Sequence, residues 1–162
     1  MITVSVFFGI VAAICLIPSL YRGAVQDLKE FKFSEAHFNT YWINAAFVCV
    51  ILMYIALVSE GLWFLAVEFF VLSILALLGF SFIAFRYGGG GDWRALIYIA
   101  CIAPFVFIQA IVAAAVCGMV QAIYWVLRTD IETPAMYRKI PFALSILAGY
   151  LISLIWFIVT VL

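Results

Sequence analysis

Two aspartates, Asp27 and Asp92, are the residues of this chain whose type and placement best suit chemistry. Each follows an apolar stretch that is long enough to enter a membrane, so we expect both carboxyls at one membrane surface. Two carboxylates that meet there suit aspartyl proteolysis: an ionised acid takes a proton from water, and a neutral one donates to the scissile carbonyl. Such a pair titrates as a unit, so the sequence leaves the acid and base roles unassigned.

Four consecutive glycines, at positions 88–91, stand directly before Asp92. Glycine loses more backbone entropy than any other residue when it is ordered, but it can turn sharply and approach a substrate closely. The run also places Asp92 at the N-terminal end of the next helix, where free N–H groups favour a carboxylate. The plainer alternative is that Asp92 merely begins a helix after a loop. A phosphate-binding loop is disfavoured, because the Gly-Lys-Ser/Thr ending is missing and an acid would repel the phosphate.

A third acid, Glu68, lies inside an apolar block. A charge there usually marks a cavity, a partner or a protonated state. We expect Glu68 to be structural and remote from catalysis, either neutral or hydrogen-bonded to a polar group such as Gln109 or Gln121. We expect His37 to be solvated near the membrane surface.

The composition restricts the class of protein. Of the 162 residues, 70% are apolar, 18% aromatic and 10% charged, with a net charge of zero. Soluble domains are roughly 45–50% apolar and about 25% charged. A water-soluble globule, a disordered chain, a disulfide-rich secreted module and a nucleic-acid binder are therefore excluded. The four cysteines form no CxxC or Cys/His cluster, so we expect buried thiols and no metal site. We predict one membrane domain over residues 1–162, surrounded by the lipid bilayer.

The apolar residues fall into five blocks: Ile2 to Leu20, Tyr41 to Val58, Leu62 to Phe85, Ala95 to Leu127 and Ile140 to Leu162. As one helix, the fourth block would be ~50 Å long, too long for a single crossing. It contains Pro104 and Gln109, and a tight turn between them would divide it into two crossings. We therefore predict an all-α protein with six transmembrane helices.

The basic residues support this count. In the six-helix arrangement, all of them fall in or beside the first, third and fifth loops: Arg22, Lys29, Lys32, Arg86, Arg94, Arg128, Arg138 and Lys139. Five helices would put the last three on the opposite side from the others. The positive-inside rule then places these loops and both aspartates at the cytoplasmic face of the cell membrane, and both termini outside.

Three segments together resemble a known family. Residues 89–92 (GGGD) match the GxGD motif of intramembrane aspartyl proteases. Residues 24–29 (AVQDLK) resemble the first aspartate motif of type IV prepilin peptidases and archaeal preflagellin peptidases. Residues 140–144 (IPFAL), followed by Gly149, look like that family's last segment, which is rich in Ile-Pro-Phe. The resemblance extends over essentially the whole chain.

The resemblance implies the six-helix GxGD protease fold, with Asp27 and Asp92 as catalytic residues and water as the nucleophile. It implies no metal or organic cofactor. The implied substrates are prepilin-like or preflagellin-like membrane proteins, cut between a short basic leader and a hydrophobic helix. In this reading Gly89 and Gly91 shape a loop that can pair with an extended substrate strand. Arg94 tunes Asp92, and its fixed charge is expected to lower the proton affinity of that acid.

The chain departs from the family in lacking the cytoplasmic zinc domain, with paired CxxC motifs, of many bacterial members. Arg94 also stands where the family often has lysine. An alternative of another class is a non-enzymatic membrane subunit, or a proton or ion pathway that uses Asp27, Glu68 and Asp92 as relay groups. A relay needs acids distributed across the bilayer, whereas a catalytic pair needs two acids at one level.

Overall fold

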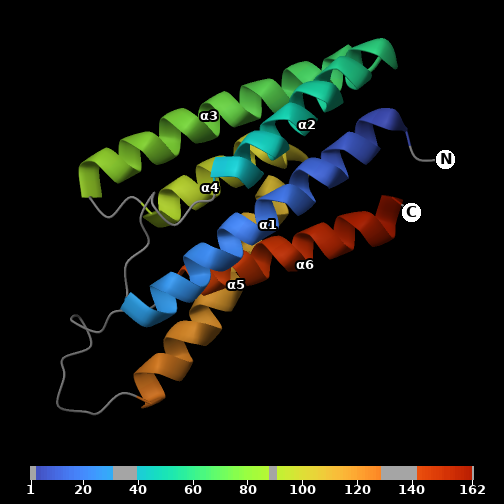
Figure 1. Ribbon diagram of the computed structural model, residues 1–162. Helices are drawn as coiled ribbons and strands as arrows, with labels where there is room; N and C mark the ends of the chain where they lie inside the picture. The colour runs from blue at the N-terminus through green and yellow to red at the C-terminus, as the bar shows by residue number, and fades with distance from the viewer. Residues whose placement is uncertain (1–2, 31–39, 88–90, 129–141, 162) are drawn as a thin grey trace.

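The computed structural model describes residues 3–30, 40–87, 91–128 and 142–161, and these form a bundle of helices (Figure 1). The helices, in chain order, are α1 (Val4–Glu30), α2 (Thr40–Ser59), α3 (Trp63–Tyr87), α4 (Gly91–Ile102), α5 (Pro104–Arg128) and α6 (Ala143–Val161). The described part of the chain contains no strand, which confirms the all-α prediction.

Five of the six helices are long and apolar enough to cross a membrane; they are all except α4. The 12 residues of α4 make a helix of about 18 Å, which is shorter than the roughly 30 Å hydrocarbon core. The predicted division of the fourth apolar block is therefore confirmed, but Pro104 to Gln109 are helical in α5, and the break precedes the predicted turn. The first part of the block is not a complete crossing, so only five of the six predicted transmembrane helices are long enough to span. The break falls at Ala103, because Pro104 disfavours a helical conformation in the residue before it and suits the first position of a new helix.

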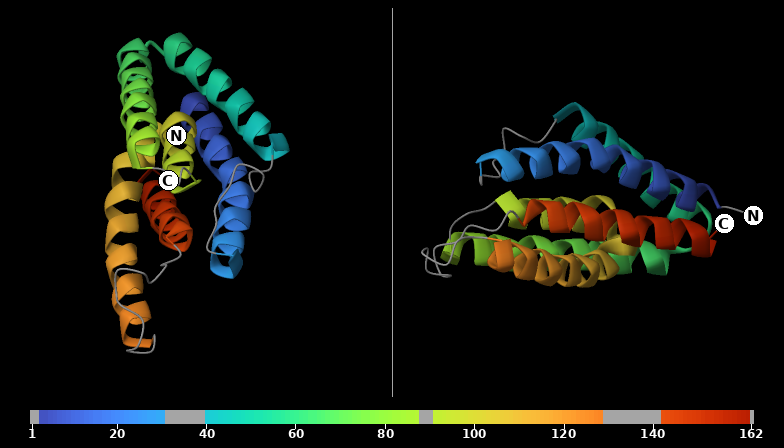
Figure 2. Two further views of the ribbon diagram at one scale, coloured as in Figure 1. Left: turned by 90° about the vertical axis from the view of Figure 1, so that its left-hand side faces the viewer. Right: turned by 90° about the horizontal axis from the view of Figure 1, so that it is seen from below.

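The chain runs back and forth along the bundle axis (Figures 1 and 2). Both chain termini and the turn between α2 and α3 lie at one end, which we name the Glu60 end after the residue in that turn. The last turn of α1 and the first turns of α4 and α6 lie at the other end, which we name the aspartate end. From there α4 runs into the bundle, and α5 turns back towards the same end. The two helices form a V that enters and leaves on one side.

Small residues allow the helices to approach closely, as is usual in membrane bundles. The most extensive packing joins α5 to α6 and α1 to α2. At Gly149 of α6, a Cβ atom would lie 2.7 Å from the Cα of Ala114 and 2.9 Å from the carbonyl oxygen of Ala110, both on α5. Because these are backbone atoms, only glycine permits this helix crossing.

The outer surface of the bundle is apolar. The described part of α3 buries only Ala66 and Ala76 well and exposes large side chains such as Phe70, Leu75 and Phe82. A soluble protein rarely exposes so much contiguous apolar area, whereas lipid solvates it readily. Together with the long apolar helices, this surface indicates a multi-pass membrane protein.

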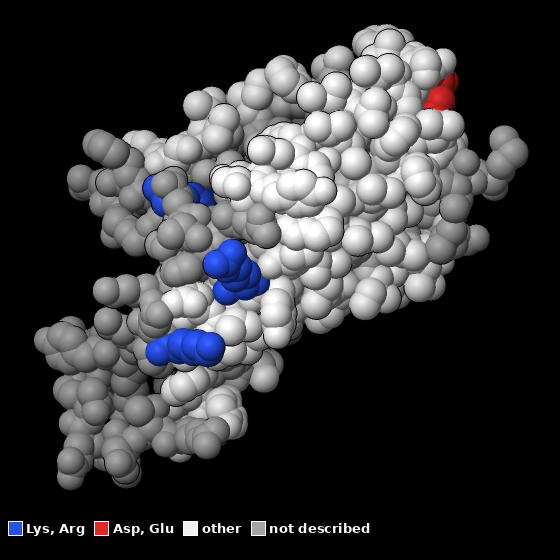
Figure 3. All heavy atoms as spheres, viewed as in Figure 1, with Lys and Arg blue, Asp and Glu red and all other residues white. Residues whose placement is uncertain are grey.

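The charged side chains that are visible on one face of the molecule lie towards the two ends of the bundle (Figure 3). In this view the Lys and Arg side chains lie towards the aspartate end, and the acidic group that is visible lies at the other end. This agrees with the prediction that the basic residues share one side of the bundle, as far as the described residues extend. The predicted orientation, with this side in the cytoplasm, stays a prediction.

Candidate functional site

Asp27 lies near the C-terminal end of α1 and is only 7% exposed. Its Oδ2 accepts a hydrogen bond from the backbone N–H of Ala143, at 3.0 Å. Ala143 is the first residue of α6, where an N–H group has no partner within its own helix. The preceding residue, Phe142, accepts the first helical hydrogen bond but has no side-chain oxygen to act as a cap. Asp27 supplies that acceptor from another helix, and the N–H and the helix dipole stabilise its ionised form.

Asp92 lies in the first turn of α4, outside the five membrane-spanning helices. Burial, reinforced by the negative charge of Asp27, raises the pKa of Asp92 to about 6. Its Oδ1 atom is buried and has no hydrogen-bond partner among the described residues. This carboxyl therefore keeps its proton to a higher pH than an ordinary aspartate does, and it has an atom free to interact with a ligand.

The structure thus brings together the two aspartates that the sequence singled out, although 65 positions separate them. The helices that carry them, α1 and α4, contact each other, and α6 contacts both. The two carboxyls have unequal surroundings, because Oδ2 of Asp27 receives an N–H, whereas Oδ1 of Asp92 is buried and receives none from the described residues. One ionised and one protonated carboxyl beside each other can act as general base and general acid towards a bound carbonyl group and a water.

The structure describes the other predicted site residues only in part. Gly89 lies outside the described residues, and Gly91 begins α4. Arg94 is exposed in the first turn of α4. The expected effect of Arg94 on the proton affinity of Asp92 stays a prediction. The pKa of Asp92 is raised by burial and by the charge of Asp27.

Sequence analysis missed how α4 is anchored beside the site. The ring of Trp93, next to Asp92, stacks on Phe80 of α3, with ring centroids 5.7 Å apart and planes inclined by 20°. Phe80 in turn meets Phe107 of α5 edge-on, at 6.0 Å. These contacts fix the first turn of α4 against two neighbouring helices. No local signal in the sequence distinguishes such a packed tryptophan from one that sits at the membrane surface.

A polar contact between the first turn of α6 and α5 was also not predicted from the sequence. The hydroxyl of Ser145, which is buried, donates to the Oε1 atom of Gln121 on α5. Glu68 lies exposed in the second turn of α3, and no described residue bonds to it, so the second of its two expected alternatives, a hydrogen bond to Gln109 or Gln121, is not observed. Because α3 begins at the Glu60 end, Glu68 is remote from Asp27 and Asp92, as predicted.

The cysteines are free thiols, as predicted, but they are less buried than predicted. All four are half-buried rather than fully buried. Within the described residues, no three His, Cys, Asp or Glu side chains gather closely enough to hold a metal ion. His37 lies outside the described residues.

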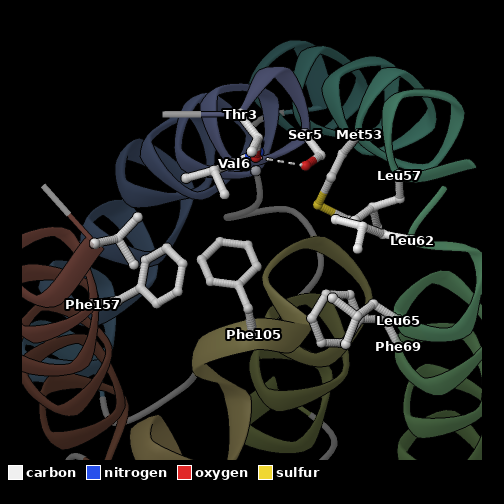
Figure 4. Close-up of a pocket in the computed structure, with 12 residues that line it drawn as sticks. Thr3, Ser5, Val6, Met53, Leu57, Leu62, Leu65, Phe69, Phe105 and Phe157 are labelled. Atoms are coloured by element: carbon white, nitrogen blue, oxygen red, sulfur yellow. Dashed lines mark hydrogen bonds between the residues drawn. The ribbon is translucent and has the colours of Figure 1, made fainter. Parts of the chain in front are cut away.

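A pocket of about 230 Å³ lies at the Glu60 end, remote from the aspartates (Figure 4). Phe105 of α5 and Phe157 of α6 form one side, with ring centroids 4.5 Å apart, and Met53 and Phe69 lie opposite. None of its lining residues is an acid, a base or a histidine. This pocket therefore offers no groups for acid–base chemistry, and the candidate site is the pair of aspartates.

Comparisons with protein-family models, with curated proteins and with solved structures gave no match to this chain.

Proposed function

We propose that this protein is a membrane aspartyl endopeptidase that uses Asp27 and Asp92 to hydrolyse a peptide bond at the membrane surface. The observation that supports this most directly is that α1 and α4 bring two carboxyls to one end of the bundle, near enough for the charge of Asp27 to raise the pKa of Asp92. One of them is held by an N–H group, and the other is buried with a raised pKa. Two neighbouring carboxyls with unequal surroundings are what this hydrolysis requires.

The proposed reaction needs only these two groups and water. The Asp27 carboxylate takes a proton from water while the water oxygen attacks the carbonyl carbon of the substrate. Asp92 donates its proton to the carbonyl oxygen, which gives a neutral tetrahedral diol. On collapse, the C–N bond breaks, the amine leaves with the proton from Asp27, and one hydroxyl returns its proton to Asp92. The products are a carboxylic acid and an amine, and both aspartates regain their starting states.

The substrate class follows from the position of the pair. A membrane protein with one hydrophobic helix and a short leader outside the bilayer presents the junction between them at the depth of the aspartate end. Prepilin-like and preflagellin-like proteins have this form, and the GGGD, AVQDLK and IPFAL segments resemble the peptidases that process them. We therefore propose that the protein removes the leader at the cytoplasmic face, within the GxGD protease fold.

The placement of the acids favours this function over a proton or ion relay. Asp27 and Asp92 share one end of the bundle, whereas Glu68 lies exposed on α3 near the opposite end. A relay would distribute its acids along one path through the protein.

Replacing each aspartate by its amide tests the proposal. Asp27→Asn and Asp92→Asn should each abolish leader cleavage of a co-expressed prepilin, while Glu68→Gln should cleave like the wild type. Membrane fractionation should show equal insertion of all three variants. Mass spectrometry of a leader peptide incubated with the purified protein would locate the cut. Full cleavage by either asparagine variant would exclude the paired mechanism.

A further inference from the structure

The ring of Phe142, the residue before α6, packs directly against Gly118 on α5, at a distance that only glycine permits. A Cβ atom on Gly118 would lie 2.6 Å from Cε2 of Phe142 and 3.3 Å from its Cδ2. Real Cβ atoms do not approach another carbon this closely, so any side chain at position 118 must displace the ring. The atoms that it would meet belong to a side chain, not to backbone, so the ring can move without separating the helices.

The ring of Phe142 is directly connected to the site. Phe142 is the residue before α6, and its carbonyl oxygen accepts hydrogen bonds from the N–H groups of Ser145 at 3.0 Å and Ile146 at 3.2 Å. Its backbone is therefore held in the first turn of α6. The next residue, Ala143, donates its N–H to Asp27. Gly118, the Phe142 ring, the Ala143 N–H and the Asp27 carboxyl thus form one chain of contacts from α5 to α1.

We propose that Gly118 is a positioning residue for Asp27. By leaving room for the ring of Phe142, it lets the first turn of α6 present the Ala143 N–H to the Asp27 carboxylate. The structural part of this inference stands on the contacts alone. Its effect on catalysis rests on the proposed endopeptidase function.

The consequence is a fixed division of roles between the two aspartates. The N–H group stabilises negative charge on Asp27, whereas Oδ1 of Asp92 is buried without a donor. Asp27 is then the base that activates water, and Asp92 is the acid that holds the shared proton. The charged groups whose side chains are described on the other positions of these helices are Arg22 and Lys29 on α1 and Arg94 on α4. The neutral titratable groups are Cys15 and Tyr21 on α1, Tyr98 and Cys101 on α4, Cys117 and Tyr124 on α5, and Tyr150 on α6. None of these groups is altered by a substitution at Gly118.

The first measurement is independent of activity. With alanine amides labelled with ¹⁵N, hydrogen exchange at Ala143 reports the bond to Asp27, and Asp27→Ala gives the rate for an unpaired N–H. We expect Gly118→Ala to accelerate this exchange towards that rate. Gly79→Ala on α3 is the matched control, because a Cβ there meets no atom within 4 Å. Equal exchange at Ala143 in Gly118→Ala and in the wild type would overturn the proposal.

The second measurement is cleavage as a function of pH. Loss of a hydrogen bond to a charged group should lower kcat about tenfold, with little change in KM. The acidic limb of the profile, which reports the ionisation of the pair, should move to higher pH by about one unit. Gly79→Ala should leave the limb in place. A lowered kcat with an unmoved acidic limb would show a merely structural role and would overturn the proposal.

Rescue provides a further test. Combining Gly118→Ala with Phe142→Leu removes the clashing ring atoms and should restore both the Ala143 protection and the acidic limb. If Gly118→Ala alone does not fold, the double variant tests the same connection: folding with wild-type exchange at Ala143 supports the proposal. A double variant that also fails to fold, or that exchanges Ala143 as fast as Asp27→Ala, would overturn it. If exchange responds as expected while both aspartate-to-asparagine variants still cleave prepilin, the positioning inference stands and the proposed function fails.

Discussion

The backbone N–H of Ala143 donates to the Oδ2 atom of Asp27 at 3.0 Å, across 116 residues of chain. This bond joins the end of α1 to the start of α6. It satisfies an N–H that helix geometry leaves without a partner, and it stabilises a charge that burial makes costly. It also makes Asp27 chemically different from Asp92, whose buried Oδ1 atom has no such donor among the described residues.

Leader cleavage should decline as the pH rises past about 6. The pKa of Asp92 is about 6, because burial and the charge of Asp27 both oppose its ionisation. Below that pH the pair retains the proton that the carbonyl oxygen must receive, and above it this proton is lost. The measurement is kcat/KM against pH for the purified protein with a prepilin substrate. A rate that keeps rising from pH 6 to pH 9 would contradict the assignment of Asp92 as the acid.

Asp92→Asn should make the protein more stable at neutral pH. The folded state holds the Asp92 proton up to about pH 6, whereas an ordinary aspartate loses it near 3.8. Between these values the folded state binds more protons than the unfolded state, so stability falls as the pH rises through this window. Above it, the cost of ionising the buried carboxyl is on the order of 3 kcal/mol.

Thermal unfolding in detergent would measure this effect. At pH 7.5 Asp92→Asn should melt several degrees above the wild type, and near pH 4 the two should melt together. Glu68→Gln serves as the control, because Glu68 is exposed and should change little at either pH. Equal melting temperatures of Asp92→Asn and the wild type at pH 7.5 would argue against a buried, costly charge.

Glu60→Gln should loosen the first turn of α1. Glu60 accepts hydrogen bonds from the N–H of Ser5 at 3.1 Å and from its hydroxyl at 2.5 Å. These bonds hold the pKa of Glu60 below its ordinary value. The attachment should therefore be complete above about pH 4.5 and be lost as the pH falls through the lowered pKa. Hydrogen exchange in residues 4–8 would measure it.

The control for this variant is again Glu68→Gln, since no described residue bonds to Glu68. Exchange in residues 4–8 should be faster in Glu60→Gln at pH 7 and unchanged in Glu68→Gln. If neither variant alters exchange, the carboxylate is not what holds the N-terminus of α1 in place.

Tyr150→Phe should destabilise the fold by about 1 kcal/mol. The Tyr150 side chain is completely buried, and its hydroxyl donates to the carbonyl oxygen of Ala13 on α1 at 2.8 Å. Tyr21→Phe is the matched control, because Tyr21 is 61% exposed. The free energy of unfolding, measured in denaturant, should be lower for Tyr150→Phe than for Tyr21→Phe. Equal free energies for the two variants would contradict a stabilising bond between α1 and α6.

The turn between α2 and α3 illustrates how far local sequence determines structure. Gly61 adopts a positive φ of 77°. The N–H of Leu62 bonds to the carbonyl of Leu57, and that of Gly61 to the carbonyl of Val58, which is the Schellman arrangement at a helix end. A single glycine after an apolar run is enough to indicate such a stop. Pro104 marks the break between α4 and α5 in the same local way.

Sequence alone determined the membrane-spanning class, the number and approximate limits of the helices, the shared side of the basic residues, and the two aspartates as candidates. These features follow from composition and spacing, because a charge or a helix breaker in an apolar chain is informative by itself. Only the tertiary structure decided that α4 stops short of a crossing, that Glu68 is exposed, and that Ala143 donates to Asp27. These depend on which helices approach closely, as Gly118 and Gly149 allow, and such contacts join residues that no local pattern relates.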